Sequence, residues 1–302
     1  MHVFDIQSLT KSYHVGGDLA NQDISFQIEK GEVFGLLGDN GAGKSTLVKQ
    51  MVNLLQPDSG RIRFLGKSIH SDPLNLLRHV SYMPQSCNIL SHLTVGEVIF
   101  HTAFLLGLRH SVARMERDRL LKLLQIEHIS HRISGTLSGG ERRLLQLAVA
   151  LVGTLPVIIL DEPTNELSPQ RRNLVWETLR ELNQRQGTTI ILVTHDTMEA
   201  EKIVQRVGIL HTGRLVAMGS PQELKQQLSQ MFRLEFFCDP TISPPALSLK
   251  AQQIAFGHWI THLPYSQLYH ALDLLTQSRI VDFKLSSPSL EDIYIHYASD
   301  TT

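Results

Sequence analysis

The most constraining feature of the sequence is a glycine-rich loop, Gly38–Ser45, which reads Gly-x-x-x-x-Gly-Lys-Ser. An apolar, strand-like segment at 32–37 precedes the loop, and a segment with helical periodicity and no internal glycine or proline follows it at 46–55. A strand, a loop of this composition and a helix together form a phosphate-binding unit. The sequence therefore predicts an α/β fold organised around a bound phosphate.

The residue types in the loop suit a nucleotide. Glycines let backbone N–H groups approach a phosphate closely, and the N-terminus of the following helix adds positive potential. Lys44 is expected to reach the β- and γ-phosphates, and the Ser45 hydroxyl to coordinate Mg²⁺. The nucleotide-binding residues expected here are Gly38, Asn40, Gly41, Gly43, Lys44, Ser45 and Thr46. The alternative, a glycine-rich turn with a chance Lys-Ser pair, does not account for the flanking strand and helix.

Composition excludes several other classes of protein. The formal net charge of −1 and pI near 7.0 give no electrostatic footprint for nucleic acid. Two cysteines, Cys87 and Cys238, cannot make a disulfide framework, which fits a reducing compartment. The N-terminus lacks the pattern of a signal peptide, and the apolar stretches 98–108 and 155–160 are too short to span a bilayer. The chain is not expected to cross a membrane by itself.

The order of predicted elements divides the chain into two parts. Strand-like segments at 2–7, 22–29 and 61–65 predict an antiparallel β region beside the phosphate loop. Residues from about 86 to 150 are expected to be helical, with helices near 94–107, 112–125 and 139–152. Strands and helices then alternate through residue 218, which predicts a mostly parallel sheet. A Pro-rich segment at 239–245 lies in the last part, and we expect domains at 1–230 and 231–302, the second a small α+β unit.

Two carboxylates follow a buried strand. Val157–Leu160 runs directly into Asp161 and Glu162, and ligands of α/β sheets bind at the carboxyl ends of the strands. Phosphoryl transfer to water needs one carboxylate for Mg²⁺ and a second to orient the attacking water. We assign Asp161 to the metal and Glu162 to the water.

Three further pieces occur in an ordered series with the loop. Ser138, Gly139 and Gly140 open the amphipathic helix at 142–152 and form a second anion site there. Gln85 follows the strand-like segment 80–84, and His195 follows the strand at 189–193. Taken singly, these pieces fit a helix cap, a turn residue and one of 15 histidines with a structural role. Their order and spacing after a phosphate loop favour a shared function.

With these motifs together, the sequence resembles the ATP-binding subunits of ABC transporters over about residues 2–230. The matching pieces are the phosphate loop Gly38–Ser45, the Q-loop Gln85, the signature Leu137–Glu141, the Walker B segment Val157–Glu162 and the switch histidine His195. The resemblance implies a P-loop NTPase core with an antiparallel β subdomain and a helical signature subdomain, plus a small C-terminal α+β appendage. It also implies two cassettes that sandwich two ATP molecules, each phosphate loop facing Ser138, Gly139 and Gly140 of the other copy.

The resemblance further implies the roles of individual residues and partners. Tyr13 would stack on adenine, and Gln85 would touch Mg²⁺ or the attacking water and link the nucleotide to the helical region that docks on a membrane partner. The expected catalytic residues are Glu162, His195 and Gln85, and the expected Mg²⁺ ligands are Ser45, Gln85 and Asp161. The expected partners are an integral-membrane permease and a second ATP-binding subunit, most simply a homodimer, at the cytoplasmic face of the cell membrane, with no nucleic acid.

The sequence departs from the family pattern after the Walker B glutamate. Many members carry Gly-Leu-Asp there, whereas this chain has Glu166 at the glycine position and Ser168 at the aspartate position. That aspartate helps to couple the two sites, so the strength of coupling is open, although Ser168 can cap the following helix. Glu141 stands where many members have glutamine, a common substitution.

The C-terminal segment narrows the assignment. The segment Ser287–Tyr294 reads Pro-Ser-Leu-Glu-Asp after its first serine. It resembles the ending of ATPases of drug, antibiotic and polysaccharide exporters. It is also a helix start, with Ser289 able to cap and Glu291 and Asp292 in the first turn. An importer subunit and a regulatory cassette remain alternatives. An ABC ATPase that acts on DNA or the ribosome is disfavoured, because there is one cassette, no heptad array and no basic patch.

Overall fold

The computed structural model describes residues 1–14, 17–86, 90–227, 231–238, 249, 251–278, 280 and 282–299. Cys87 and the Pro-rich segment 239–245 lie outside these ranges. The chain divides into two compact units, residues 1–218 and 219–302, so the division falls earlier than the expected boundary after residue 230. Helix α8 (Pro221–Gln227) contacts helix α10 (Leu290–Ser299) and therefore belongs with the second unit.

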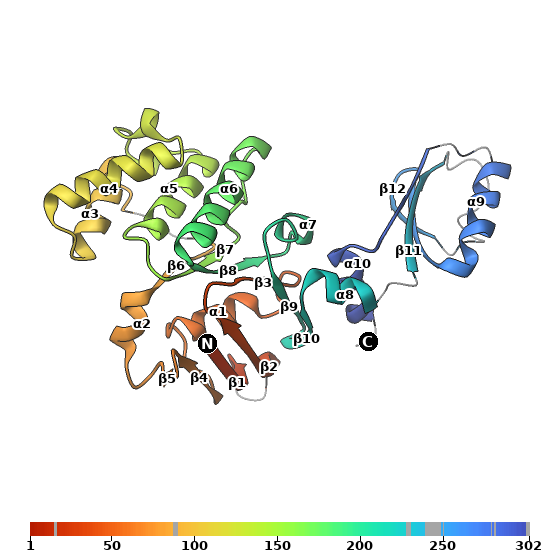
Figure 1. Cartoon of the computed structure of the whole chain (residues 1–302), viewed down its shortest axis with the longest axis horizontal. Helices are drawn as coiled ribbons and strands as arrows, with labels where there is room; N and C mark the ends of the chain where they lie inside the picture. Colours follow the sequence, from red (N-terminus) through yellow and green to blue (C-terminus); the bar gives the residue numbers. More distant parts are fainter. Residues whose placement is uncertain are drawn as a thin grey trace. The chain divides into compact units, whose positions relative to one another are not determined.

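The N-terminal unit contains two sheets (Figure 1). The first has the order β2-β1-β4-β5 and is antiparallel, as the sequence predicts. The second has the order β10-β9-β3-β8-β7-β6, and its pairs from β9 to β6 are parallel. The strands are β1 (His2–Ser12), β2 (Leu19–Glu29), β3 (Val33–Leu37), β4 (Ser59–Phe64), β5 (Lys67–Ser68), β6 (Val80–Met83), β7 (Val157–Asp161), β8 (Thr189–Thr194), β9 (Arg206–His211) and β10 (Arg214–Gly219).

The helices of this unit follow the predicted pattern with changed ends. They are α1 (Lys44–Met51), α2 (Pro73–His79), α3 (Val95–Leu105), α4 (His110–Leu123), α5 (Gly139–Leu151), α6 (Pro169–Gln186) and α7 (Thr197–Ala200), with short 3₁₀ turns η1 (Glu127–Ile129) and η2 (Ser134–Thr136). Helix α1 ends four residues before the predicted Leu55, because Asn53 adopts a left-handed conformation with φ 57° that ends a helix. Helices α3, α4 and α5 contact one another and form the predicted helical region (Figure 1).

The core of the N-terminal unit lies between the two sheets and α1. Its largest fully buried side chains include Phe4, Phe34 and Phe64, and Phe34 stacks on Phe26 with ring centroids 5.5 Å apart. All five residues of β7 and all six of β8 are buried, as expected for central parallel strands covered on both faces. Burial on both faces fixes the strand ends that carry the acidic residues.

The C-terminal unit is an α+β unit, as predicted. Its antiparallel sheet has the order β12-β13-β11-β14, formed by β11 (Met231–Phe237), β12 (Gln252–Ala255), β13 (His258–Pro264) and β14 (Phe283–Ser286). The turn η3 (Tyr265–Gln267) leads into α9 (Leu268–Gln277), whose Ala271 and Leu275 pack in a core with Leu234 and Phe236. Across the described residues of both units, we find no helix with the length and apolar character needed to span a bilayer.

Candidate active site

Three adjacent parallel strands bring the candidate residues together. Strand β3 leads into the glycine-rich loop, β7 ends at Asp161, and β8 leads into His195, with β8 paired between the other two. Because parallel strands end at the same edge of the sheet, residues far apart in sequence meet there. The described residues therefore gather the predicted phosphate loop, carboxylates and histidine at one edge.

The loop has a conformation that only glycine adopts without strain. Gly41 and Gly43 have φ values of 86° and 97°, and a Cβ atom on Gly43 would overlap the carbonyl oxygen of Ala20. The Lys44 ammonium donates to the carbonyl oxygens of Gly38 at 2.6 Å and Asp39 at 2.9 Å. Burial lowers the pKa of Lys44, although the nearby carboxylates oppose the shift. The lysine is therefore held in the loop, in reach of a phosphate bound there.

Ser45 and Asp161 form a direct contact across the sheet edge. The Ser45 hydroxyl donates to Asp161 Oδ2 at 3.0 Å, although the residues are 116 positions apart. Asp161 is only 2% exposed, and burial raises the pKa of its carboxyl group, with a smaller opposing effect of the Ser45 bond. A buried carboxylate with one neutral hydroxyl partner and an open cavity beside it has the electrostatics of a cation site.

Glu162 is held by the end of β8. Its carboxylate accepts bonds from the Thr194 hydroxyl at 3.0 Å and from the His195 backbone N–H at 3.0 Å. The Nδ1 atom of His195 lies 2.6 Å from the same Glu162 oxygen. Glu162 is 3% exposed and has a left-handed φ of 53°, so its position is fixed by the surrounding structure. The carboxylate is thus oriented by two neighbouring residues of the predicted switch segment.

These residues line one cavity of about 450 Å³. The predicted residues on its walls are Tyr13, Asn40, Gly41, Gly43, Lys44, Ser45, Thr46, Gln85, Asp161 and Glu162. Tyr13 is 55% exposed, and its hydroxyl lies 3.1 Å from the Thr46 hydroxyl, so its ring face is available to a planar group. Gly38 and His195 do not line the cavity themselves. Gly38 accepts a hydrogen bond from Lys44, and His195 contacts Glu162, both of which line it.

The predicted signature residues lie apart from this cavity. Ser138 caps α5 and forms a capping box with Glu141, whose carboxylate accepts from the Ser138 backbone and hydroxyl at 2.8 Å each. Gly139 lines a neighbouring hollow of about 240 Å³ that shares only Gln85 with the cavity. Ser138 and Gly140 line neither, so these residues do not meet the phosphate loop of their own chain.

The two departures from the family pattern have visible consequences. Glu166 has a left-handed φ of 65°, the conformation that glycine adopts most readily, and a Cβ on Gly139 would overlap its carboxylate oxygen. The carboxylate therefore lies against the N-terminus of α5. Ser168 occupies the N-cap position of α6, but its side chain makes no capping bond.

Sequence reasoning missed Arg143, which links the motifs. This arginine of α5 is 6% exposed and donates to the backbone carbonyl oxygens of Asp161 at 2.5 Å and Gln85 at 2.8 Å, and also to that of Glu162. Burial lowers the pKa of Arg143, and the nearby Asp161 and Glu162 oppose the shift. Two adjacent arginines, Arg142 and Arg143, lie in the first half of this helix, and the sequence carries no signal for which one is buried.

The sheet, the loop and the paired carboxylates define an ATP-binding cassette, and comparison with known proteins agrees. The sequence profile described as ABC transporter matches residues 21–165. The Nod factor export ATP-binding protein I of Burkholderia thailandensis is 40% identical over 220 residues, 73% of this chain and 71% of that protein. Its namesake from Mesorhizobium japonicum is 39% identical over 222 residues, 73% of this chain and 64% of that protein.

Solved structures share the architecture. CbiO1 of Clostridium perfringens, part of the ABC transporter complex cbiONQ, matches with a TM-score of 0.66 and 30% identity, over 75% of this chain and 91% of that one. A dimeric ATP-binding cassette bound to ADP and Pi matches in fold, with a TM-score of 0.67 and 24% identity over 72% of this chain and 98% of that one. The chain belongs to the ABC transporter family, as an ATP-binding subunit. It is an ATPase of that family.

Proposed function

We propose that this ATPase drives the export of a solute through a separate integral-membrane permease, as a peripheral subunit at the cytoplasmic face of the membrane. The observation that supports ATP hydrolysis as the energy source is the arrangement of Glu162, oriented by Thr194 and His195 on the wall of a cavity that Lys44 and Ser45 also line. The relatives named as export ATP-binding proteins support the direction of transport. The tail motif that includes Ser289 and Asp292 supports the same branch.

Within the site, each residue has a distinct proposed task. Lys44 and the loop amides bind the phosphates, Tyr13 stacks on the base, and Glu162 accepts a proton from the attacking water while His195 keeps its carboxylate in place. Ser45, Asp161 and Gln85 suit Mg²⁺, because they supply oxygen ligands on the wall of one cavity. When bound there, Mg²⁺ would neutralise charge on the phosphates.

The position of the signature residues supports a dimer as the working unit. Ser138 and Gly140 do not line the nucleotide cavity of their own chain, and the N-terminus of α5 carries the positive potential that favours an anion. We propose that a second copy places these residues on the γ-phosphate. ATP then holds two copies together, and its hydrolysis releases them, which moves the permease between two states.

The role of Glu162 is tested by Glu162→Gln. Removing the base should lower ATP turnover by about 100-fold or more, because general-base catalysis contributes at least this factor. The variant should also form an ATP-dependent dimer on size-exclusion chromatography. Glu177→Gln, a change at an exposed position of α6, is the matched control and should behave as wild type. Unchanged turnover in Glu162→Gln would refute the role assigned to this carboxylate.

The transport role is tested by purification of the tagged chain from native membranes in mild detergent. A polytopic membrane protein without a soluble solute-binding protein is the expected partner for export. A solute-binding protein in the complex would indicate import. Recovery of the chain without any membrane protein would contradict the transport proposal while leaving the ATPase result intact.

A further inference from the structure

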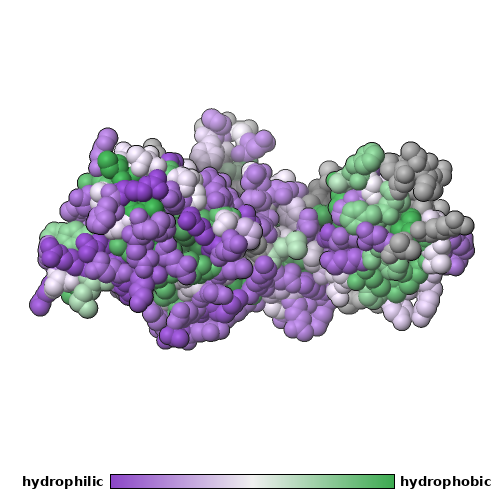
Figure 2. Space-filling model, turned by 90° about the horizontal axis from the view of Figure 1, so that it is seen from above, coloured by the Kyte–Doolittle hydropathy of each residue, from purple (hydrophilic) through white to green (hydrophobic). Residues whose placement is uncertain are grey.

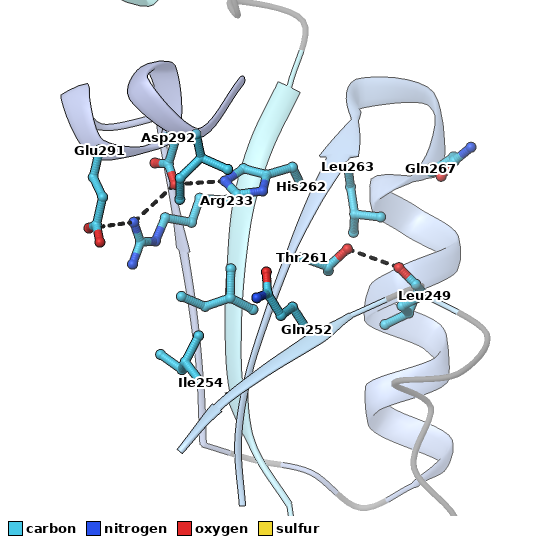
Figure 3. A pocket seen from close by; sticks show the side chains of 12 residues that line it. Arg233, Leu249, Gln252, Ile254, Thr261, His262, Leu263, Gln267, Glu291 and Asp292 are labelled. Atoms are coloured by element: carbon cyan, nitrogen blue, oxygen red, sulfur yellow. Dashed lines mark hydrogen bonds and ion pairs between the residues drawn. The ribbon is translucent and has the colours of Figure 1, made fainter. Parts of the chain in front are cut away.

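The C-terminal unit contains a cavity that the ATPase chemistry does not use. It has a volume of about 630 Å³, within the range of small-molecule sites, and lies between strands β12 and β13, β11 and helix α10 (Figure 3). Part of its wall carries charged side chains, including Arg233, Glu291 and Asp292. Its wall also carries the aliphatic side chains of Ile254, Ile260 and Ile295, the last one helical turn after Glu291 on α10. The cavity is therefore amphipathic, with charged and aliphatic side chains on its walls.

Both carboxylate oxygens of Asp292 already take part in hydrogen bonds with neighbouring residues. Its Oδ1 atom accepts from Arg233 at 3.0 Å and lies 2.7 Å from His262 Nε2 (Figure 3). Its Oδ2 atom accepts from the backbone N–H and the hydroxyl of Ser289, both at 2.7 Å. With 1% of its side chain exposed, this carboxylate fixes α10 to β11 and β13 and has no capacity for a ligand.

Arg233 is likewise neutralised within the protein. Its Nε donates to Glu235 at 2.8 Å, and its Nη1 donates to Asp292, so two carboxylates already face one guanidinium. Glu291 adds a third, 3.6 Å from Nη1, which is beyond a hydrogen bond. Half of the Glu291 side chain is exposed, and among the described residues it accepts no hydrogen bond. Glu291 is therefore the negative group that a ligand can reach.

Isoleucine side chains on the cavity wall offer hydrocarbon. Ile254 on β12 is 52% exposed and Ile295 on α10 is 46% exposed, and Ile260 lies on the adjacent strand. Figure 2 shows hydrophobic residues gathered on the surface of the C-terminal unit. Covering half-exposed isoleucines with an aliphatic group removes apolar surface from water and is favourable. A reachable carboxylate and hydrocarbon on the same cavity wall define the chemistry that fits.

We propose that this cavity binds a small organic cation with an aliphatic body, its ammonium paired with Glu291 and its hydrocarbon packed on Ile254, Ile260 and Ile295. Because Glu291 lies in the first turn of α10, beside Asp292, an occupant stabilises α10 on the sheet. Ligand binding is thus linked to the stability of the C-terminal unit. The site lies outside the nucleotide cavity, so the proposal stands independently of the proposed transport function.

The test is a titration of the full-length protein with n-alkylammonium chlorides from ethyl to hexyl. The readout is the fluorescence of Trp259 on β13. The chain has two tryptophans, so the experiment uses a Trp176→Phe background in which Trp259 is the single fluorescent tryptophan. We expect saturable binding whose affinity rises about 4-fold per added methylene, as for burial of hydrocarbon. Isothermal calorimetry provides a second readout that does not depend on the fluorophore.

Variants separate the proposed contacts from general effects. Glu291→Gln should weaken hexylammonium binding at least 10-fold, and Ile254→Ser should flatten the dependence on chain length. Asp273→Asn removes one negative charge from exposed α9 outside the cavity and should bind as wild type. Equal affinity of Glu291→Gln and wild type, absence of saturable binding, or equally tight binding of hexanoate would each overturn the proposal.

Discussion

A buried pair of amide side chains behind the phosphate loop gives a quantitative prediction. Asn21 on β2 and Gln50 on α1 are both 0% exposed. Gln50 Nε2 donates to Asn21 Oδ1 at 2.7 Å and to the Thr46 carbonyl oxygen at 3.2 Å, and Asn21 Nδ2 donates to the Gly43 carbonyl oxygen at 3.1 Å. The pair therefore connects α1 and β2 to Gly43, the last glycine before Lys44.

The loss of stability on breaking this series of hydrogen bonds depends on which groups are left without a partner. In Asn21→Ala, Gln50 keeps its bond to Thr46, and the Gly43 carbonyl keeps its backbone bond from Leu47 at 2.9 Å. One buried N–H is left unpaired, which costs about 1–3 kcal/mol, and the lost side-chain volume adds to this. We expect the free energy of unfolding of the N-terminal unit to fall by about 2–3 kcal/mol.

Replacing the other member of the pair should lower the free energy of unfolding by less. Gln50→Met leaves Asn21 Oδ1 without its donor, but it also removes Gln50 Oε1, a buried oxygen with no partner among the described residues. We expect a loss of about 1 kcal/mol. In the double variant neither amide is left facing an apolar group. Its free energy of unfolding should therefore fall by about 1–2 kcal/mol less than the sum of the decreases in the two single variants.

The assay is urea unfolding of the wild type and three variants, followed by the fluorescence of Trp176 in a Trp259→Phe background. Trp176 is a buried residue of α6 and so reports on the N-terminal unit alone. Fitting each curve gives the free energy of unfolding, and the double-mutant cycle gives the coupling. If the decreases in the two single variants sum to the decrease in the double variant within about 0.5 kcal/mol, the inference that the two amides act as a connected pair is refuted.

Two further predictions concern single residues. The hydrogen bonds of Asp292 with His262 and Ser289 outweigh its burial and hold its pKa well below the usual range, so its stabilising contribution is full above a pH of about 4 and is lost as the pH falls toward the folded-state pKa. Acid unfolding followed by Trp259 should be steeper in wild type than in Asp292→Asn, which is less stable at pH 7; parallel curves would contradict this. Glu166→Gly should be about 1 kcal/mol more stable than Glu166→Ala, because φ at this position is 65°; equal urea midpoints would show that the left-handed backbone carries no strain.

The elements of the nucleotide-binding half could be predicted because their signals are local. A glycine-rich loop, two acidic residues after an apolar run and a serine before an amphipathic helix each specify a short structure without reference to the rest of the chain. The contact between Ser45 and Asp161 then follows from the parallel order of the strands. The roles of these residues in catalysis remain predictions, of which Glu162→Gln tests the role of the carboxylate.

The features that the sequence did not reveal depend on tertiary packing. Nothing local distinguishes Gln50 from an exposed helical glutamine, and its burial arises because β2 lies over α1. The same is true of the cavity in the C-terminal unit. Its isoleucines come from separate strands and a helix. The antiparallel register, in which Gln252 pairs with Ile260, and the packing of α10 on the sheet bring them to one cavity.

Arg143 shows why contacts of this kind escape motif analysis. Its guanidinium reaches Asp161 at the end of β7, the following Glu162, and Gln85 through their carbonyl oxygens, which every residue type supplies. A planar group with five donors can serve several carbonyls at once, whereas a lysine ammonium is a single point charge. The helix that begins at Ser138 is thereby joined to both the carboxylate segment and the Q-loop within one chain. Movement of that helix would therefore displace the backbone that carries Glu162. If a second copy binds at the N-terminus of α5 as proposed, its binding would have a direct mechanical route to the residue proposed to act on the attacking water.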